Sequence, residues 1–362
     1  MLNIKKSLSF CVCIIFLFSF CSCPGKGELE HSDSEVGFIC FGDNLIHEPI
    51  YRYGEEKGGN YDFLYAHVRD KIEAYDFAVI NQETPLTNGN YSDYPHFATP
   101  DNIASAIKNA GFDIAVCATN HMLDRGYEGV LSTAAAFDEE DVLHVGINTL
   151  PESERVLFVE KNGIDFAICN YTFSLNGIEP PENKEFCVNT LFDESGVRKE
   201  LKYARENSEV LIVFVHWGTE YSHDIDEFQK KWTDIFSEEG VDVVVGTHPH
   251  VLEPYGLAAR GDGSSMLVFY SLGNFISCQI GDEKILGGAA SFSFSKTGDK
   301  VVLADYGLEA VVTHQEFPEV CAYMLSDYND ILAGKNRGNL TKEGFETLFK
   351  NIMEGKTYEK SG

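Results

Sequence analysis

Residues 241–254, VDVVVGTHPHVLEP, decide the fold class of this chain. A valine-rich run leads directly into Gly246 and then into His248 and His250, with Pro249 between the two histidines. A buried strand followed by a tight turn delivers imidazoles to the rim of a site in this way. The pattern predicts either a metal site that uses both imidazoles or a polar loop with two incidental histidines. The ends of the other strands decide between these interpretations.

Short apolar strands alternate with helices along most of the chain. We expect strands at 36–42, 75–80, 112–119, 142–146, 210–215, 241–246 and 265–276, and helices at 61–74, 100–110, 126–139, 197–206 and 228–239. An Asn-Gly turn at 162–163 predicts a hairpin, and residues 287–313 alternate like an antiparallel hairpin at a sheet edge. This succession predicts an α/β fold with one catalytic domain at residues 36–315, followed by a helical appendage at 316–362.

Composition narrows the range of partners. The chain has 362 residues, with 28 Lys and Arg against 57 Asp and Glu, a formal net charge of −29. Such acidity argues against nucleic acid and against unassisted binding to an anionic lipid surface. Of the 10 cysteines, the six beyond residue 23 are scattered without metal-ligand spacing. We expect free buried thiols with at most one disulfide.

Residues 1–23 have the pattern of an export signal, with Lys5 and Lys6 before an apolar run at 8–20. Ser22 directly precedes Cys23, as in the bacterial lipobox, which makes Cys23 the expected acylated first residue of the mature protein. Simple cleavage and a retained anchor are the alternatives. Residues 24–35 would form a flexible tether. The predicted location is the extracytoplasmic face of the cell membrane, reached through a lipid anchor.

The predicted strands end in residues that can bind metal ions. In chain order these are Asp43, Asn81 with Glu83, Asn120 with His121, His216, and His248 with His250. Because the carboxyl ends of strands in open α/β sheets lie at one edge, these side chains are expected to converge. Mixed carboxylate, amide and imidazole ligands suit Mn, Zn or Fe, and a carboxylate able to bridge indicates two divalent ions.

The ordered set GDNLIH, NQE, NH followed by Asp124, HWGTEY, GTHPH and SLGNF resembles the bacterial capsule synthesis protein CapA family over about residues 36–276. This family comprises poly-γ-glutamate capsule biosynthesis proteins of the calcineurin-like metallophosphoesterase clan. The resemblance implies a four-layer α/β/β/α sandwich with a two-metal centre. It implies that Asp43 and His250 hold one metal, that Asn120, His216 and His248 hold the other, and that Glu83 bridges them.

The first motif departs from that of the better-known phosphoesterases, which have a histidine two residues after the aspartate. This chain has Leu45 at that position. Either His47 replaces the missing ligand or the first metal is bound weakly.

The position of one histidine also predicts a general acid. His121 follows the ligand Asn120 and is placed to protonate a leaving group, with Asp124 orienting it. Alternatively, His121 is a hydrogen-bonding residue behind the ligands and Asp124 caps the following helix. Expected substrate contacts around this centre are His47, Asn81, Trp217, Glu220, Tyr221 and Asn274. Trp217 could equally be a packed aromatic residue, and Asn274 is expected to brace the HxH loop.

Three functions are compatible with these residues. The first is a cell-surface dinuclear metal-dependent phosphoesterase-like hydrolase in the synthesis, release or anchoring of an anionic envelope polymer, with poly-γ-glutamate as the product that the resemblance implies. The second is a non-catalytic accessory lipoprotein that binds polymer or scaffolds a membrane synthase. The third is a metal-dependent amide or peptide hydrolase. A complete ligand set favours catalysis, whereas Leu45 favours the accessory role.

Overall fold

The structure is a computed structural model that describes residues 34–355. The predicted signal at 1–23, the acylation site Cys23 and nearly all of the predicted tether at 24–35 lie outside the described residues. Within residues 34–355, no helix has the length and apolar character needed to cross a membrane.

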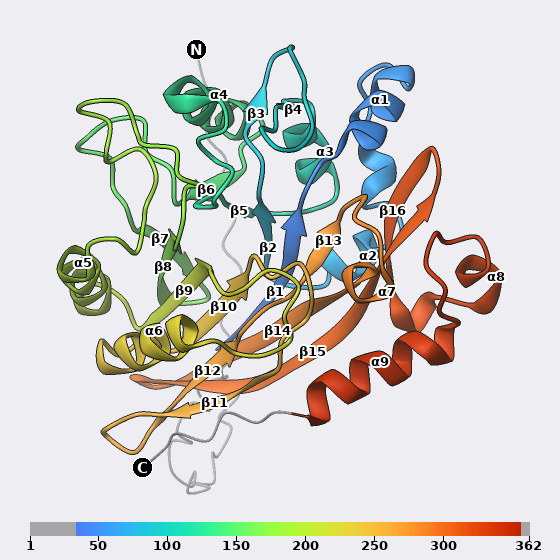
Figure 1. Cartoon of the computed structure of the whole chain (residues 1–362). Helices are drawn as coiled ribbons and strands as arrows, with labels where there is room; N and C mark the ends of the chain where they lie inside the picture. The colour runs from blue at the N-terminus through green and yellow to red at the C-terminus, as the bar shows by residue number, and fades with distance from the viewer. Residues whose placement is uncertain (1–33, 356–362) are drawn as a thin grey trace, which may run out of the picture. The chain divides into compact units, whose positions relative to one another are not determined.

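The first sheet has eight strands in the order β16-β15-β14-β1-β2-β5-β6, with β13 paired to β1 (Figure 1). Its strands are β1 (Ser34–Asn44), β2 (Phe77–Gln82), β5 (Ile114–Val116), β6 (Leu143–Val145), β13 (Asn274–Ile276), β14 (Leu286–Thr297), β15 (Lys300–Glu316) and β16 (Glu319–Met324). Strands β1, β2, β5 and β6 are parallel, whereas β14, β15 and β16 extend the sheet by antiparallel pairing.

The second sheet has six strands in the order β11-β12-β10-β9-β8-β7. They are β7 (Leu157–Lys161), β8 (Ile164–Thr172), β9 (Val210–His216), β10 (Val243–Thr247), β11 (Tyr255–Ala259) and β12 (Ser265–Phe269). β8, β9, β10 and β12 are parallel. Every residue of β9 and β10 is buried, which is why these strands are continuous apolar runs in the sequence. A further two-stranded sheet joins β3 (Leu86–Thr87) to β4 (Thr99–Pro100).

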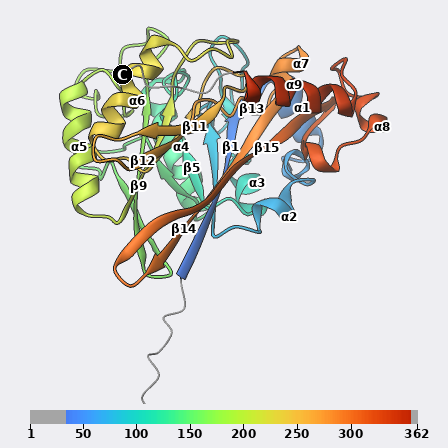
Figure 2. The same ribbon diagram turned by 90° about the horizontal axis from the view of Figure 1, so that it is seen from below.

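Helices cover the outer faces of both sheets. They are α1 (Glu48–Glu56), α2 (Arg69–Ile72), α3 (Ile103–Asn109), α4 (Gly126–Glu139), α5 (Glu194–Glu206), α6 (Glu227–Glu238), α7 (Asp282–Ile285), α8 (Asp330–Ala333) and α9 (Lys342–Glu354), with 3₁₀ turns η1 (Asp62–Leu64) and η2 (Leu325–Asp327). Figure 2 shows α5 and α6 on the opposite side of the sheets from α2 and α3. This arrangement gives the layers α/β/β/α.

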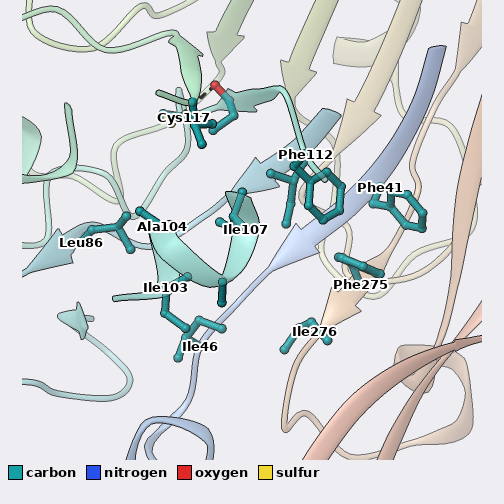
Figure 3. Packing of buried hydrophobic residues seen from close by; sticks show 14 of the residues in the cluster. Phe41, Ile46, Leu86, Ile103, Ala104, Ile107, Phe112, Cys117, Phe275 and Ile276 are labelled. Carbon is teal, nitrogen blue, oxygen red and sulfur yellow. Dashed lines mark hydrogen bonds between the residues drawn. The ribbon is translucent and has the colours of Figure 1, made fainter. Parts of the chain in front are cut away.

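Four apolar clusters lie within residues 34–355, and three of them hold the layers together. The cluster between the sheets is rich in phenylalanine, and the Phe38 ring lies 4.9 Å from that of Phe77 and 5.2 Å from that of Phe292. Burying one such side chain stabilises the fold by about 1.5–3 kcal/mol. A second cluster joins α5 and α6 to the six-stranded sheet. The third joins α3 and α4 to the other sheet, and includes Ile103, Ile107, Phe112 and Phe275 (Figure 3).

The expected strand at 265–276 is two strands in different sheets, so that prediction was wrong. β12 lies in the six-stranded sheet, and after a turn at Gly273, with φ +61°, β13 pairs with β1 in the other sheet. The crossing chain passes so close to β1 that a Cβ on Gly42 would lie 1.9 Å from the carbonyl oxygen of Gly273. Apolar character continues through the crossing because both sheets bury their strands.

Three further expectations differ from the structure. The helix expected at 61–74 is broken into η1 and α2. The apolar spacing predicted one continuous helix because Leu64, Val68 and Ile72 are buried on both sides of the break. Neither α1 nor β16 was expected. β16 pairs with β15 and continues the sheet to Met324, so the helical appendage begins after residue 324 and not at 316. The six cysteines of the described chain are all free, and five of them are buried, as expected.

Candidate metal centre

The carboxyl ends of strands from both sheets meet at one place. Asp43 lies beside Asn81 in the β1–β2 pairing, and His216 lies beside Thr247 in the β9–β10 pairing. Glu83 follows β2 directly. One ligand atom from each of Asp43, Glu83 and His250 lies within 4.8 Å of the other two, and all three residues are buried. The convergence predicted from the strand ends is therefore present.

On the first side of the centre, Asp43 lies against His250. The Oδ2 atom of Asp43 is 3.0 Å from Nδ1 of His250, and Oδ1 accepts a hydrogen bond of 2.9 Å from Nδ2 of Asn81. Nδ1 of His250 is also 3.1 Å from Oδ1 of Asn274. Asn274 in turn donates to Gln279 and to the carbonyl of Lys284. The first-metal residues expected from the sequence are thus in contact with each other.

On the second side, three nitrogen and oxygen ligand atoms face one another. Nε2 of His216 is 3.0 Å from Oδ1 of Asn120 and 3.3 Å from Nδ1 of His248. Nδ1 of His216 is 2.9 Å from Oγ1 of Thr247, which fixes the ring so that Nε2 faces the other two residues. At most one proton can lie between two imidazole nitrogens at this distance. A cation shared by the three side chains would satisfy their lone pairs together.

Glu83 lies between the two sides. Its Oε1 is 3.8 Å from Nε2 of His250 and 3.9 Å from Nε2 of His216. Both of its carboxylate oxygens are buried, and neither has a hydrogen-bond partner among residues 34–355. A buried carboxylate without partners costs free energy unless a cation compensates it. With carboxylate, imidazole and amide donors around it, Glu83 fits a position between divalent metal ions.

The pKa values of the metal-free centre reflect this crowding. Burial raises the pKa of Glu83 well above its usual range, and Asp43 and Glu220 add to the rise while His250 opposes it. Burial lowers the pKa of His250, but the carboxylates of Glu83 and Asp43 outweigh it and raise the value to about 9. Burial and the neighbouring imidazoles hold the pKa of His216 and His248 well below normal. Both of these histidines are therefore neutral, as metal ligands must be.

The HxH loop has a strained backbone. His248 has a φ of 101° and His250 a φ of 60°, conformations that residues other than glycine seldom adopt. The loop is held on one side by a hydrogen bond from the Trp217 amide to the Thr247 carbonyl, and on the other by one from the Tyr221 amide to the Pro249 carbonyl. Strain of about 1–3 kcal/mol per residue persists only where the surroundings impose it, and it concentrates at functional sites.

His121 and Asp124 form a pair next to the second side. Nδ1 of His121 is 2.7 Å from Oδ2 of Asp124, and both side chains are nearly buried. Oδ2 also accepts a hydrogen bond from the amide of Phe97. The residue at the N-cap of α4 is Arg125, whose side chain makes no capping hydrogen bond to the helix. The Asp124 side chain contacts His121 instead of capping that helix. Because a carboxylate only accepts, the proton on Nδ1 lies toward Asp124.

Residues 38–279 match the model of a protein family described as bacterial capsule synthesis protein PGA_cap. The chain belongs to this family. The capsule biosynthesis protein CapA of Bacillus anthracis is 28% identical over 266 residues, which cover 68% of this chain and 61% of that protein. The PGA biosynthesis protein CapA of Bacillus subtilis (strain 168) is 26% identical over 253 residues, covering 68% and 64%. The chain thus spans less than two thirds of the length of these relatives.

Among solved structures, the family member resembles a putative 5′-nucleotidase from Staphylococcus aureus that was solved with α-ketoglutarate. The TM-score is 0.50 at 12% identity, and the match covers 76% of this chain and 54% of that chain. At this identity the likeness concerns the fold alone. The expected α/β/β/α layering is confirmed, as is the resemblance to the CapA family.

Around the centre of this capsule synthesis family member, two of the expected substrate contacts make hydrogen bonds outside the ligand cluster. Trp217 is fully buried, donates its indole N–H to the carbonyl of Tyr270 and packs on Phe236, so its aromatic character serves the core. His47 is not brought into the ligand cluster. Its Nδ1 is 2.9 Å from Oδ1 of Asp93, and the side chain at the position of the absent histidine, Leu45, is buried in the core.

The remaining expected contacts line the centre. Glu220 is exposed, and its charge contributes to raising the pKa of both Glu83 and His250. The ring of Tyr221 is 5.9 Å from that of His250, and the ammonium of Lys284 lies 3.9 Å above the same tyrosine. Burial and Glu220 raise the pKa of Tyr221 to about 12, so it is a neutral phenol.

Two residues that contact the centre were missed by sequence reasoning. Thr247 stands in the quoted stretch, but only the register of β10 against β9 shows that its hydroxyl meets His216. Asn176 lies in the loop after β8, and its amide contacts both Asn120 and His121. No spacing or composition distinguishes this asparagine from others in loops, so the sequence offered no signal for it.

Proposed function

We propose that the chain is a metal-dependent hydrolase of phosphoesterase type that acts in synthesis, release or anchoring of an anionic capsule polymer at the outer face of the cell membrane. The single observation that carries this proposal is Glu83, a buried carboxylate without hydrogen-bond partners in the described chain that lies between His216 and His250. Membership of the capsule synthesis family supports the polymer, and the names of the CapA relatives support poly-γ-glutamate.

In this proposal the ligands divide as the geometry suggests. Asp43 and His250 would hold one ion, Asn120, His216 and His248 the other, and Glu83 would contact both. Divalent ions at these positions would activate a water molecule and neutralise negative charge on a phosphoryl group. Mn, Zn and Fe are the metals that this donor set suits.

The His121–Asp124 pair supplies the proton. Asp124 accepts the N–H at Nδ1 of His121, which leaves Nε2 as the nitrogen able to donate a proton to the leaving oxygen. At the exposed edge of the centre, Tyr221, Glu220 and Lys284 would contact the substrate. His47 and Asn81 lie farther from solvent and hold Asp93 and Asp43 by hydrogen bonds.

One experiment tests the catalytic proposal. The purified full chain, loaded with Mn, is assayed for hydrolysis of bis(4-nitrophenyl) phosphate and of 4-nitrophenyl phosphate, together with the His121→Ala variant. We expect turnover that falls by about 10²–10⁴-fold in the variant, with unchanged metal content. Turnover that the variant retains would remove His121 from this role.

A non-catalytic accessory function is the second candidate, and Leu45 is the observation that favours it. The absence of a histidine there leaves the first side with Asp43, His250 and Glu83 as its charged or imidazole ligands. An accessory protein would use the same centre to bind polymer or to contact a membrane synthase. A metal-loaded chain that hydrolyses neither phosphoesters nor poly-γ-glutamate, but binds poly-γ-glutamate, would support this function. Cleavage of poly-γ-glutamate would instead indicate an amide hydrolase.

Attachment to the membrane belongs to the same proposal. Cys23 would carry the acyl chains, and residues 24–35 would tether the domain. Metabolic labelling with a fatty acid should mark the wild-type protein and not Cys23→Ser. Label retained in that variant would refute the assignment of the anchor.

A further inference from the structure

The other proposed metal ligands do not by themselves fix the orientation of the Asn120 side-chain amide. Its side-chain amide is buried, and only the carbonyl oxygen of an amide can bind a metal ion. The two ends of the amide have nearly the same shape. A rotation of the amide by half a turn would point NH₂ at Nε2 of His216 and form an N–H···N hydrogen bond in the metal-free protein. In that rotated state, neither the side-chain oxygen of Asn120 nor Nε2 of His216 is available to bind a metal ion.

Asn176 provides the partner that selects one orientation. Nδ2 of Asn120 donates to Oδ1 of Asn176 over 3.2 Å, while Oδ1 of Asn120 faces His216. We propose that Asn176 is a positioning residue that holds the amide of Asn120 with its oxygen toward the metal-ligand cluster. This inference rests on the proposed metal centre and assigns the orientation of its amide ligand to a residue outside it.

The position of Asn176 is itself well determined. The backbone N–H of Asn176 donates to Oγ of Ser174. The φ of Asn176 is +53°, a conformation that asparagine tolerates better than most residues. The adjacent Leu175 is buried in the cluster beneath α3 and α4, and Ile178 packs against the same cluster. The loop therefore presents an exposed side chain from a fixed backbone.

The two ends of the Asn176 amide face different neighbours, with Oδ1 toward Asn120 and Nδ2 toward His121. Nδ2 of Asn176 is 3.5 Å from Nδ1 of His121, whose proton already lies toward Asp124 at 2.7 Å. Nδ1 of His121 therefore has no lone pair to accept from Asn176. Since the Asn176 oxygen accepts from Asn120, its NH₂ lies on the side of His121 and remains available to a substrate oxygen.

The test measures metal binding by the full chain and needs no turnover. Co²⁺ is titrated into the metal-free protein, and its visible absorption and binding isotherm are recorded for wild type, Asn176→Gly, Asn176→Asp and Asn183→Gly. Glycine keeps the positive φ and removes the amide, whereas aspartate keeps an oxygen that accepts from Asn120. Asn183 is a matched control, since it is exposed, has a φ of 62° and lies in the same surface segment.

We expect Asn176→Gly to weaken one of two Co²⁺ equivalents by about 10–100-fold and to change its absorption, while the other equivalent is unaffected. Asn176→Asp should restore wild-type binding, and Asn183→Gly should match wild type. An Asn176→Gly isotherm and spectrum identical to wild type would overturn the inference, as would failure of aspartate to restore binding. Less than one equivalent bound by wild type would overturn the metal centre and this inference with it.

Discussion

Two buried glutamates lie on either side of the HxH loop, and their surroundings differ. Glu83 and Glu253 are both inaccessible to solvent, and burial raises the pKa of each well above its usual range. Glu253 accepts a hydrogen bond of 2.6 Å from Nε2 of Gln229, an uncharged amide on α6. Glu83 instead faces Asp43, His216 and His250, and accepts no hydrogen bond within the described chain.

The difference shows what burial alone cannot decide. One oxygen of Glu253, Oε2, accepts from Gln229, whereas Oε1 has no partner within residues 34–355. A neutral carboxyl group tolerates such burial better than a carboxylate does, because only the charged form carries the large desolvation cost. A carboxylate among imidazoles and a second carboxylate is satisfied only when it shares a cation with them. Glu253 therefore supports the backbone after the HxH loop, whereas Glu83 belongs to the metal centre.

The same substitution at both positions should produce the largest contrast. Glu83→Gln replaces the shared carboxylate with a neutral amide and should weaken metal binding by at least about 100-fold, with loss of turnover. Glu253→Gln should bind metal as wild type does, because Gln229 still finds an acceptor. Metal content by elemental analysis distinguishes them. Equal metal content in the two variants would contradict the assignment of Glu83.

A smaller effect on turnover is expected from a substitution at Asp124, which contacts His121. Asp124→Asn removes the negative charge beside Nδ1 of His121 and should lower turnover by about 10–100-fold with unchanged metal content. The control is Asp138→Asn, because Asp138 also contacts a histidine, His144 at 3.2 Å, but on the exposed surface away from the centre. Steady-state kinetics on a phosphodiester provides the measurement. Full turnover in Asp124→Asn would contradict a catalytic role for the contact between Asp124 and His121.

Metal affinity should depend on pH through the first side of the centre. The metal-free Glu83–His250 pair holds at least one proton at neutral pH, since the pKa of His250 is raised to about 9. A divalent ion displaces that proton, so the apparent affinity should increase by about tenfold per pH unit from neutral pH to about pH 9 and then level off. Competition titrations with a chelator at several pH values measure this. Affinity that falls with rising pH would contradict it.

The smallest expected effect concerns stability at Glu253. Its folded pKa lies above the usual value of 4.5, so its contribution to stability is complete below pH 4.5 and is lost as pH rises through the folded pKa. Glutamine does not titrate. The free energy of unfolding of Glu253→Gln should therefore increase with pH relative to that of wild type, and it should be the larger of the two at neutral pH. Urea unfolding of the metal-free proteins checks this, and a constant difference across pH would refute it.

The sequence was sufficient to predict the central parallel strands of both sheets and the convergence of Asp43, Glu83 and His250. Strands such as β9 and β10 are buried on both faces, which leaves an apolar run that ends where a ligand begins. Asp43, Glu83, His216 and His250 stand at or just beyond such ends, so parallel pairing places them at one edge of each sheet. The packing of the two sheets then brings the two sets together.

Other features of the fold and of the centre depend on long-range contacts, which local sequence patterns do not predict. The crossing from β12 to β13 is apolar throughout, so sequence reasoning merged two strands of different sheets into one. Trp217 follows a ligand directly, but its side chain points into the core under α6. Asn176 belongs to a loop whose path is set by the burial of Leu175, a long-range effect. These are results of tertiary packing.

Metal content is the most direct test of the account. The purified full chain is equilibrated with Mn or Zn, separated from free metal and analysed for its element-to-protein ratio. The account predicts about two equivalents for wild type, divided between the two sides of Glu83. Less than one equivalent after loading with either metal would contradict it.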